Sequence, residues 1–229
     1  MAVAPLWITA DTIQNPASIP VVKIKHMEEV VCAGVLIAPQ WVLTVASCLT
    51  LMTPMAVEVE NDVVNVTGQA LHPLYNVARF TFNLVLLQLS RAAAARPAML
   101  DFDVLAPRTQ VVARGYANST SPLNASSSPA RDETMNGTTI SNVECVETTR
   151  NLADDVVCIV SLCGVKTIGS PAVVVKNGQE AVVALLGWTW HDCTHNYMLY
   201  ERIASAKSFL EPFLPDSNAC AMSFQRPHL

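Results

Sequence analysis

Charged residues are scarce in this sequence. Only 14% of its 229 residues are Asp, Glu, Lys or Arg, whereas 51% are hydrophobic. A chain with this balance can bury a sizeable core, which excludes an intrinsically disordered protein. The formal net charge is −5. Because nucleic acids bind basic surfaces, this mild acidic excess argues against nucleic acid as a partner.

Long hydrophobic runs are also missing. No run of about 18 apolar residues could cross a bilayer, so no membrane span is expected in this chain. The opening "MAVAPLWITADTIQNPAS" lacks a basic start, and Pro5 and Asp11 interrupt its apolar stretch, unlike a signal peptide. We therefore expect a mature or shortened form, or export that depends on sequence outside this chain. No spacing typical of metal ligands is present, and we expect neither a metal nor a cofactor.

Cysteine, in contrast, is present in an odd number. Seven cysteines allow three disulfides and one free thiol, or seven reduced and buried side chains. Four N-x-S/T sequons, at Asn65, Asn118, Asn124 and Asn136, favour a chain that enters the secretory pathway, where cysteines pair. The sequence is therefore predicted to be a disulfide-bonded glycoprotein that is secreted or displayed at the cell surface.

Short runs rich in Val, Ile and Leu recur along the chain between Pro, Gly and Asn residues. They include "IPVVKIKH", "VVCAGVLIA", "WVLTVA", "NLVLLQLS", "DVVCIVSL" and "AVVALLGWTW". Regularly spaced strands of this kind predict a β-sandwich or β-barrel. The run "AVEVENDVVNV" alternates over part of its length, so one of its faces is expected to meet water.

Two segments depart from this strand pattern. Residues 118–139, "NSTSPLNASSSPARDETMNGTT", are polar and hold three of the sequons, and we interpret them as an exposed glycosylated loop or linker. Near the end, "YERIASAKSFLEPFL" has apolar residues at helical spacing and predicts a C-terminal helix that stops near Pro215. The helix would place these residues near one face: Ile203, Phe209, Leu210 and Phe213.

Several motifs resemble those of the chymotrypsin/trypsin-like serine protease family. "CAGVLIAPQWVLTVASC" resembles the family's C-G-G-x-L-I-x-x-x-W-V-L-T-A-A-H-C, and "FNLVLLQL" resembles N-D-L-x-L-L-x-L. "VVARGYANST" resembles V-x-G-W-G-x-T, "IGSPAVVV" resembles S-G-G-P-L-V, and "MLYERIASAKSFLEPFL" resembles V-Y-T-R-V-x-x-Y-x-x-W-I.

The resemblance implies an all-β fold of two packed six-stranded antiparallel β-barrels with a C-terminal helix. The homologous domain would span residues 17–214, between an N-terminal segment of residues 1–16 without the usual activation motif and a tail of residues 215–229. It also implies three disulfides, namely Cys32–Cys48, Cys145–Cys158 and Cys163–Cys193, with Cys220 free in the tail.

Serine proteolysis needs a nucleophilic hydroxyl, an imidazole that accepts its proton and a carboxylate that orients the imidazole. By the resemblance, Ser47 stands at the histidine position, Asn83 at the aspartate position and Ile168 at the serine position. A shift of one residue would place Thr167 at the serine position, and Ser170 directly precedes the proline. No catalytic residue is therefore expected.

The motifs around the active site differ from the family pattern as well. No Ile-Val-Gly-Gly motif precedes the first strand, and Lys166 or Val165 replaces the glycine of the oxyanion hole. "GWTWHDC" stands where the family has S-W-G-x-G-C, so Trp188 and Trp190 crowd the entrance of the pocket.

These substitutions predict an inactive homologue that acts as a protein-binding or regulatory extracellular module. Its candidate surface is the remnant cleft, which includes Lys166, Thr167, Trp188 and Trp190, although the same side chains could simply fill the cleft. One alternative is a residual hydrolase that uses Thr167 or Ser170 with a base from elsewhere in the fold. Another is a structural subunit linked to a second chain through Cys220.

Overall fold

The computed structural model describes eight stretches of the chain: residues 18–51, 53–79, 81–117, 131–146, 152–161, 165, 167–189 and 197–215. Its first half forms a closed antiparallel barrel in the order β1-β2-β3-β6-β5-β4. The strands are β1 (Val21–His26), β2 (Glu29–Ala38), β3 (Trp41–Thr44), β4 (Ala56–Val59), β5 (Asp62–Leu71) and β6 (Val85–Leu89).

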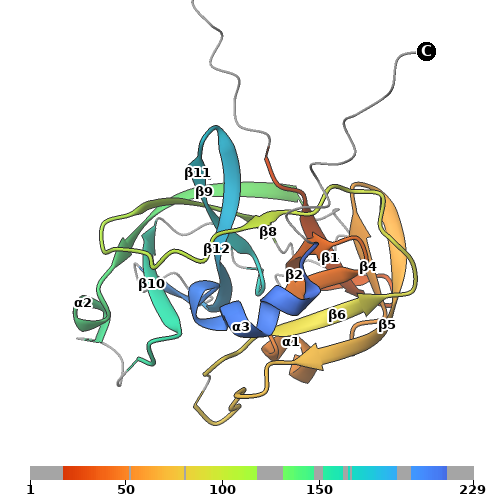
Figure 1. Cartoon of the computed structure of the whole chain (residues 1–229), viewed down its shortest axis with the longest axis horizontal. Helices are drawn as coiled ribbons and strands as arrows, with labels where there is room; N and C mark the ends of the chain where they lie inside the picture. The colour runs from red at the N-terminus through yellow and green to blue at the C-terminus, as the bar shows by residue number, and fades with distance from the viewer. Residues whose placement is uncertain are drawn as a thin grey trace, which may run out of the picture.

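The second half forms a second six-stranded barrel, closed because β11 pairs with both β8 and β12. Its strands are β8 (Gln110–Ala117), β9 (Arg131–Ile140), β10 (Val156–Ser161), β11 (Pro171–Lys176), β12 (Gln179–Trp188) and β13 (Tyr197–Arg202). The two-residue strand β7 (Met99–Leu100) adds to β12 in parallel. The predicted pair of six-stranded antiparallel barrels is confirmed, and the barrels lie beside each other in Figure 1.

The C-terminal helix is shorter than its apolar spacing predicts. Residues up to Arg202 belong to β13, so the prediction of helix at Tyr200 is wrong. Helical structure follows as η1 (Ala204–Ala206), α3 (Lys207–Leu210) and η2 (Glu211–Phe213). The strand persists because β13 pairs with both β10 and β12, and a two-sided ladder outweighs local helical spacing.

The prediction of a loop over residues 118–139 is also wrong from Arg131 onward. Strand β9 pairs with β8 along its length, from Ala117 opposite Arg131 to Gln110 opposite Thr138. Its residues alternate between the interior and the surface, and the buried ones are Met135, Gly137 and Thr139. The sequence of β9 is largely polar, so its alternation of buried and exposed residues could not be recognised from hydrophobic residues alone. Residues 118–130, with the sequons at Asn118 and Asn124, lie outside the described residues.

The turn between β4 and β5 divides a run that reads as continuous in the sequence. Glu60 and Asn61 both have positive φ, of 48° and 69°, as a two-residue hairpin turn requires. The predicted alternation holds on both strands: β4 alternates half-buried with buried side chains, and β5 alternates exposed with more buried ones. One face of this hairpin therefore meets water.

The apolar core of the first barrel extends into the second half of the chain, and the second barrel also has a core of its own. The larger cluster of buried side chains combines residues of the first barrel, such as Leu36 and Leu87, with Val182, Leu185 and Leu210 of the second half. The helical segment after β13 lies against the first barrel, where the ring of Phe213 meets Trp41 with centroids 4.8 Å apart. These apolar contacts between the first barrel and the second half of the chain pack the two barrels together.

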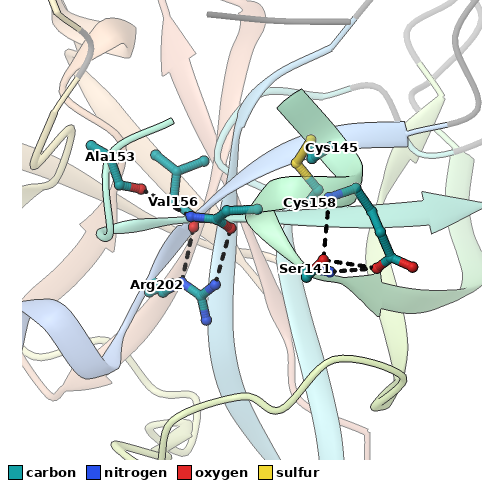
Figure 2. The surroundings of a disulfide bond; sticks show 8 residues. Ser141, Cys145, Ala153, Val156, Cys158 and Arg202 are labelled. Carbon is teal, nitrogen blue, oxygen red and sulfur yellow. Dashed lines mark hydrogen bonds between the residues drawn. A yellow bond between two sulfur atoms is a disulfide. The ribbon is translucent and has the colours of Figure 1, made fainter. Parts of the chain in front are cut away.

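Two of the three expected disulfides are formed in the described part of the chain. Cys32 of β2 is bonded to Cys48 of the short helix α1 (Ser47–Leu51). Cys145 of α2 (Asn142–Val146) is bonded to Cys158 of β10, and Figure 2 shows this bond. In the same region Arg202 Nε donates to the carbonyl oxygen of Val156 over 2.9 Å. Cys163, Cys193 and Cys220 lie outside the described residues.

Across the described residues, none of the helices combines the length and the apolar character needed to cross a membrane.

Candidate functional site

Ser47 lies at the first position of α1, just after β3. Its backbone N–H donates to Asn83 Oδ1 over 2.8 Å, and its Oγ accepts a hydrogen bond from Asn83 Nδ2 over 3.3 Å. The disulfide of the adjacent Cys48 holds this turn against β2. The residues predicted for the histidine and aspartate positions are therefore in direct contact.

Asn83 precedes β6 and is 1% exposed. Its carbonyl oxygen accepts from Ala46 N over 3.1 Å, so its backbone is also held to the turn before α1. Its Nδ2 lies 3.4 Å from Glu201 Oε1, to which it donates. A single amide thus connects half-buried Ser47 with Glu201 in the interior, and we refer to these three residues as the Ser47–Asn83–Glu201 chain.

Glu201 of β13 occupies a notch at Gly187 of β12. A Cβ at Gly187 would lie 2.5 Å from Glu201 Oε1, so any larger residue would displace the carboxyl group. In the family motifs that the chain resembles, serine stands at the position of Gly187 and threonine at that of Glu201. Because glycine has no side chain, Gly187 leaves the space that the Glu201 carboxyl group occupies.

The buried carboxyl group of Glu201 is mainly protonated at neutral pH. Burial, and to a smaller extent the charge of Asp155, raise its pKa from 4.5 to about 8, although the hydrogen bond from Asn83 lowers it. An amide N–H is far too weak an acid to pass a proton from Ser47 to this carboxyl group. The chain of three residues can hold a fixed geometry but does not form a proton relay.

Ile168 lies in the loop between β10 and β11, where the two barrels meet. The carbonyl oxygen of Ile168 accepts from Ala33 N over 2.8 Å, and Gly169 N donates to Leu186 O over 2.7 Å. The Ile168 side chain packs against the apolar clusters of both barrels. The residue predicted for the nucleophile position is thus an apolar contact between the barrels.

The two hydroxyl groups beside Ile168 are closed to solvent. Thr167 is 1% exposed, and its Oγ1 donates to the carbonyl oxygen of Tyr116. Ser170 is fully buried against Gly115, and its Oγ has no hydrogen-bond partner within the described stretches. Neither hydroxyl is placed to meet a substrate from outside.

Trp188 ends β12 and is 48% exposed. The other predicted members of the remnant cleft, Lys166 and Trp190, lie outside the described residues. The structure therefore brings Ser47 and Asn83 together and places Ile168 at the junction of the barrels.

The described residues contain two histidines. His26 is hydrogen-bonded through Nδ1 to Thr53 O. His72 is buried between the rings of Phe82 and Phe209, with centroid distances of 4.8 Å to each. Burial lowers the pKa of His72. Neither histidine is hydrogen-bonded to a serine or threonine hydroxyl in the described part of the chain.

Metal ligands do not cluster in the parts of the chain that the structure describes. Among these residues, no group of three or more His, Cys, Asp or Glu side chains is placed to hold a metal ion. Two sequon asparagines are described, and both are exposed: Asn65 lies on β5 and Asn136 on β9.

Two closed six-stranded antiparallel barrels are the architecture of chymotrypsin-like serine proteases. A sequence model of the family described as Trypsin matches residues 10–210. The chain therefore belongs to the trypsin family. Comparison with curated proteins gives no match.

Solved structures agree with this assignment at the level of the fold. The chain is similar to kallikrein-related peptidase 10 in complex with Zn²⁺, with a TM-score of 0.70, 20% identity, and coverage of 90% of this chain and 98% of that chain. A structure titled kallikrein-related peptidase 10 gives a TM-score of 0.69 at the same identity and coverage. Neuropsin, a serine protease expressed in the limbic system of mouse brain, gives 0.70 at 18% identity, covering 88% and 95%.

Sequence reasoning missed Glu201 and Gly187. Both residues depart from the motifs that carry the resemblance. Glu201 is a glutamate inside the apolar strand "YMLYERI", and Gly187 is a glycine where the motif has serine. What the sequence could not supply is the contact between them, because the pairing of β12 with β13 brings their backbones together.

Proposed function

We propose that this trypsin-family domain has no peptidase activity and acts by binding a protein partner in the extracellular space. The observation that carries the proposal is the contact of Ser47 with Asn83, together with the apolar packing of Ile168. If these positions correspond to the family's catalytic triad, the site lacks a base, a carboxylate beside that base and a nucleophile.

The contacts of Asn83 support this proposal. Its Nδ2 donates to both Ser47 and Glu201, and its Oδ1 accepts from Ser47 N. A neutral amide with its donors and acceptor in use cannot stabilise an imidazolium. The Asn83 amide therefore has hydrogen-bond partners for its N–H and C=O groups without a histidine beside it.

The burial of Thr167 and Ser170 argues against the alternative of a residual hydrolase. A nucleophile must be within reach of the substrate and of a base. Both hydroxyls are enclosed, and Thr167 Oγ1 already donates to a backbone carbonyl. The other alternative, a subunit linked through Cys220, stays a prediction that a non-reducing gel can test.

Trp188 supports a binding role. Tryptophan is enriched among the residues that dominate binding energy at protein interfaces, because its large ring gains from burial. About half of its surface is exposed at the end of β12. The disulfides Cys32–Cys48 and Cys145–Cys158 are typical of proteins in an oxidising compartment, which fits a secreted or cell-surface partner.

Absence of peptidase activity is tested with a fluorophosphonate probe and a mixed peptide library. We expect no covalent adduct and no cleavage, because no activated hydroxyl is available. An active trypsin-family protease serves as the positive control, and Ser47→Ala as the matched variant. An adduct on Ser47, Thr167 or Ser170 in the unmodified chain, lost on substitution of that residue, would overturn the proposal.

Binding is tested by affinity capture with the glycosylated chain, followed by direct titration of the captured partner. We expect Trp188→Ala to weaken binding at least about tenfold, as loss of an interface anchor does. Val104→Ala is the matched control, since Val104 is 81% exposed elsewhere on the surface. Equal loss with both variants, or no loss with Trp188→Ala, would remove Trp188 from the binding surface.

A further inference from the structure

An open apolar surface lies on the outside of the first barrel. Met27, at the turn between β1 and β2, is 70% exposed, while Met55 before β4 and Val63 on β5 are 49% and 50% exposed. The three side chains line one groove of about 830 Å³. Contiguous apolar patches on a protein surface often mark sites where a ligand or another group binds.

Asn65 lines the same groove. It lies two residues after Val63 on β5, and side chains at this spacing point to the same face of a strand. Val66 N donates to Met55 O over 2.9 Å, which fixes Met55 beside the sequon. The amide of Asn65 is therefore exposed and adjoins the apolar side chains, and Thr67 completes the sequon on the same face.

We propose that Asn65 carries an N-linked glycan whose first sugars cover the surface formed by Met27, Met55 and Val63. The donor would be an oligosaccharide linked to a lipid diphosphate. Asn65 Nδ2 forms a bond to the anomeric carbon of the first sugar, the bond from that carbon to the diphosphate oxygen breaks, and its electron pair leaves with the diphosphate. One Nδ2 proton passes to a base.

The chemistry of the groove suits this occupant. Sugar rings offer C–H faces that pack on apolar side chains and hydroxyls that hydrogen-bond at their edges. Lys25 and Glu28 line the groove beside the two methionines and could meet these hydroxyls. Because the glycan would be covalently attached at the groove, its effective concentration there is high without any separate binding partner.

Asn136 shows that an exposed sequon need not have this setting. On β9 its neighbours at the same spacing are the polar side chains Thr134 and Thr138. A glycan at Asn136 would lie over polar surface and cover no methionine of the groove. The two described sequons therefore make a matched pair that differs in the apolarity of the neighbouring surface.

The proposal is tested in a cell line that glycosylates secreted proteins, with occupancy of each sequon measured by mass spectrometry. Dilute peroxide then converts accessible methionines to sulfoxides. Thr67→Ala removes the sequon but keeps Asn65. We expect Met27 and Met55 to oxidise at least about threefold more slowly in the glycosylated chain than in Thr67→Ala. Met99, 45% exposed on β7, should oxidise equally in both.

Two further samples sharpen the outcome. Asn136→Gln should leave the protection of Met27 and Met55 unchanged. Enzymatic trimming to a single sugar should retain most of the protection, because the first sugars are those that lie on the groove. An unoccupied Asn65, or equal oxidation of Met27 and Met55 in the glycosylated chain and in Thr67→Ala, would overturn the proposal. Neither result depends on whether the domain is a peptidase.

Discussion

At Glu201, burial disfavours the negatively charged form of the carboxyl group. The carboxyl group is 4% exposed, lies against Gly187 and accepts a hydrogen bond from Asn83. Moving an unpaired carboxylate out of water is costly, and the protonated form avoids that cost. Asp155, also buried, adds a negative charge nearby and favours protonation further. Protonation of one residue is therefore coupled to the stability of the domain.

The coupling gives a pH dependence of known sign. Between the unfolded pKa of 4.5 and the folded pKa of about 8, the folded chain keeps a proton that the unfolded chain releases. The stabilising contribution of neutral Glu201 is complete below 4.5 and is lost as pH rises through 8. We expect Glu201→Gln to remove this pH-dependent loss of stability. At pH 8 its free energy of unfolding should exceed that of the parent chain by on the order of a few kcal/mol. Urea unfolding from pH 5 to 9 measures it.

Glu28→Gln serves as the control for this titration. The Glu28 side chain is 98% exposed, and its nearest cation, Lys25, is 3.8 Å away. Exposed pairs of this kind contribute little, so the pH dependence should match that of the parent chain. Parallel curves for the parent and Glu201→Gln would mean that Glu201 is not protonated in the folded domain.

Residue-scale prediction from the sequence was limited by distance along the chain. Ser47 and Asn83 were each identified from a local motif, and their contact follows from the fold that those motifs imply. Glu201 lies 118 residues from Asn83, and neither residue alone indicates a buried carboxyl group. Its role depends on the space at Gly187, which only the three-dimensional structure supplies.

At the scale of elements, a glycine in the loop between β10 and β11 allows this loop to approach strand β2 closely. Gly169 has φ of +85°, and a Cβ there would lie 2.0 Å from the carbonyl oxygen of Ala33. Its neighbour Ile168 accepts the hydrogen bond from Ala33 N. The close approach of loop and strand β2 thus depends on the absence of a side chain at Gly169.

Gly169→Ala is expected to destabilise the domain by about 3 kcal/mol or more, because strain at positive φ adds to a backbone clash. Gly178→Ala is the matched control. Gly178 has φ of +74°, but a Cβ there meets no atom within 4 Å, so only the backbone term of about 1 kcal/mol applies. Thermal unfolding of both variants gives the difference. Equal losses would show that the contact with Ala33 is not needed.

Strands with apolar runs were predictable, and strand β9 was not. The runs at β2, β3 and β10 are bounded by turn residues and read directly as buried strands. In β9 the alternating buried residues are Met135, Gly137 and Thr139, two of which carry no apolar signal. Its structure comes from pairing with β8, a partner that local composition does not identify.

At the scale of the molecule, the two barrels are expected to unfold together. Their shared cluster contains residues of both, and Ile168 contacts the cores on both sides. Apolar contacts that cross a junction make the stability of one part depend on the other. The position that the resemblance assigns to a catalytic serine therefore contributes to the stability of the whole domain.

Ile168→Ser tests stability and activity in one variant. Loss of the apolar side chain should lower the free energy of unfolding by about 2–4 kcal/mol, since the cavity lies between two packed cores. Hydrogen exchange should rise together in peptides from β3 and β10, whereas Val104→Ser, at an exposed site, should stay within about 0.5 kcal/mol of the parent chain. We expect no fluorophosphonate adduct, because Ser47 and Asn83 supply no base for the new hydroxyl. Faster exchange in one barrel alone would separate the barrels energetically, and cleavage of peptides by this variant would mean that a base lies within reach of residue 168.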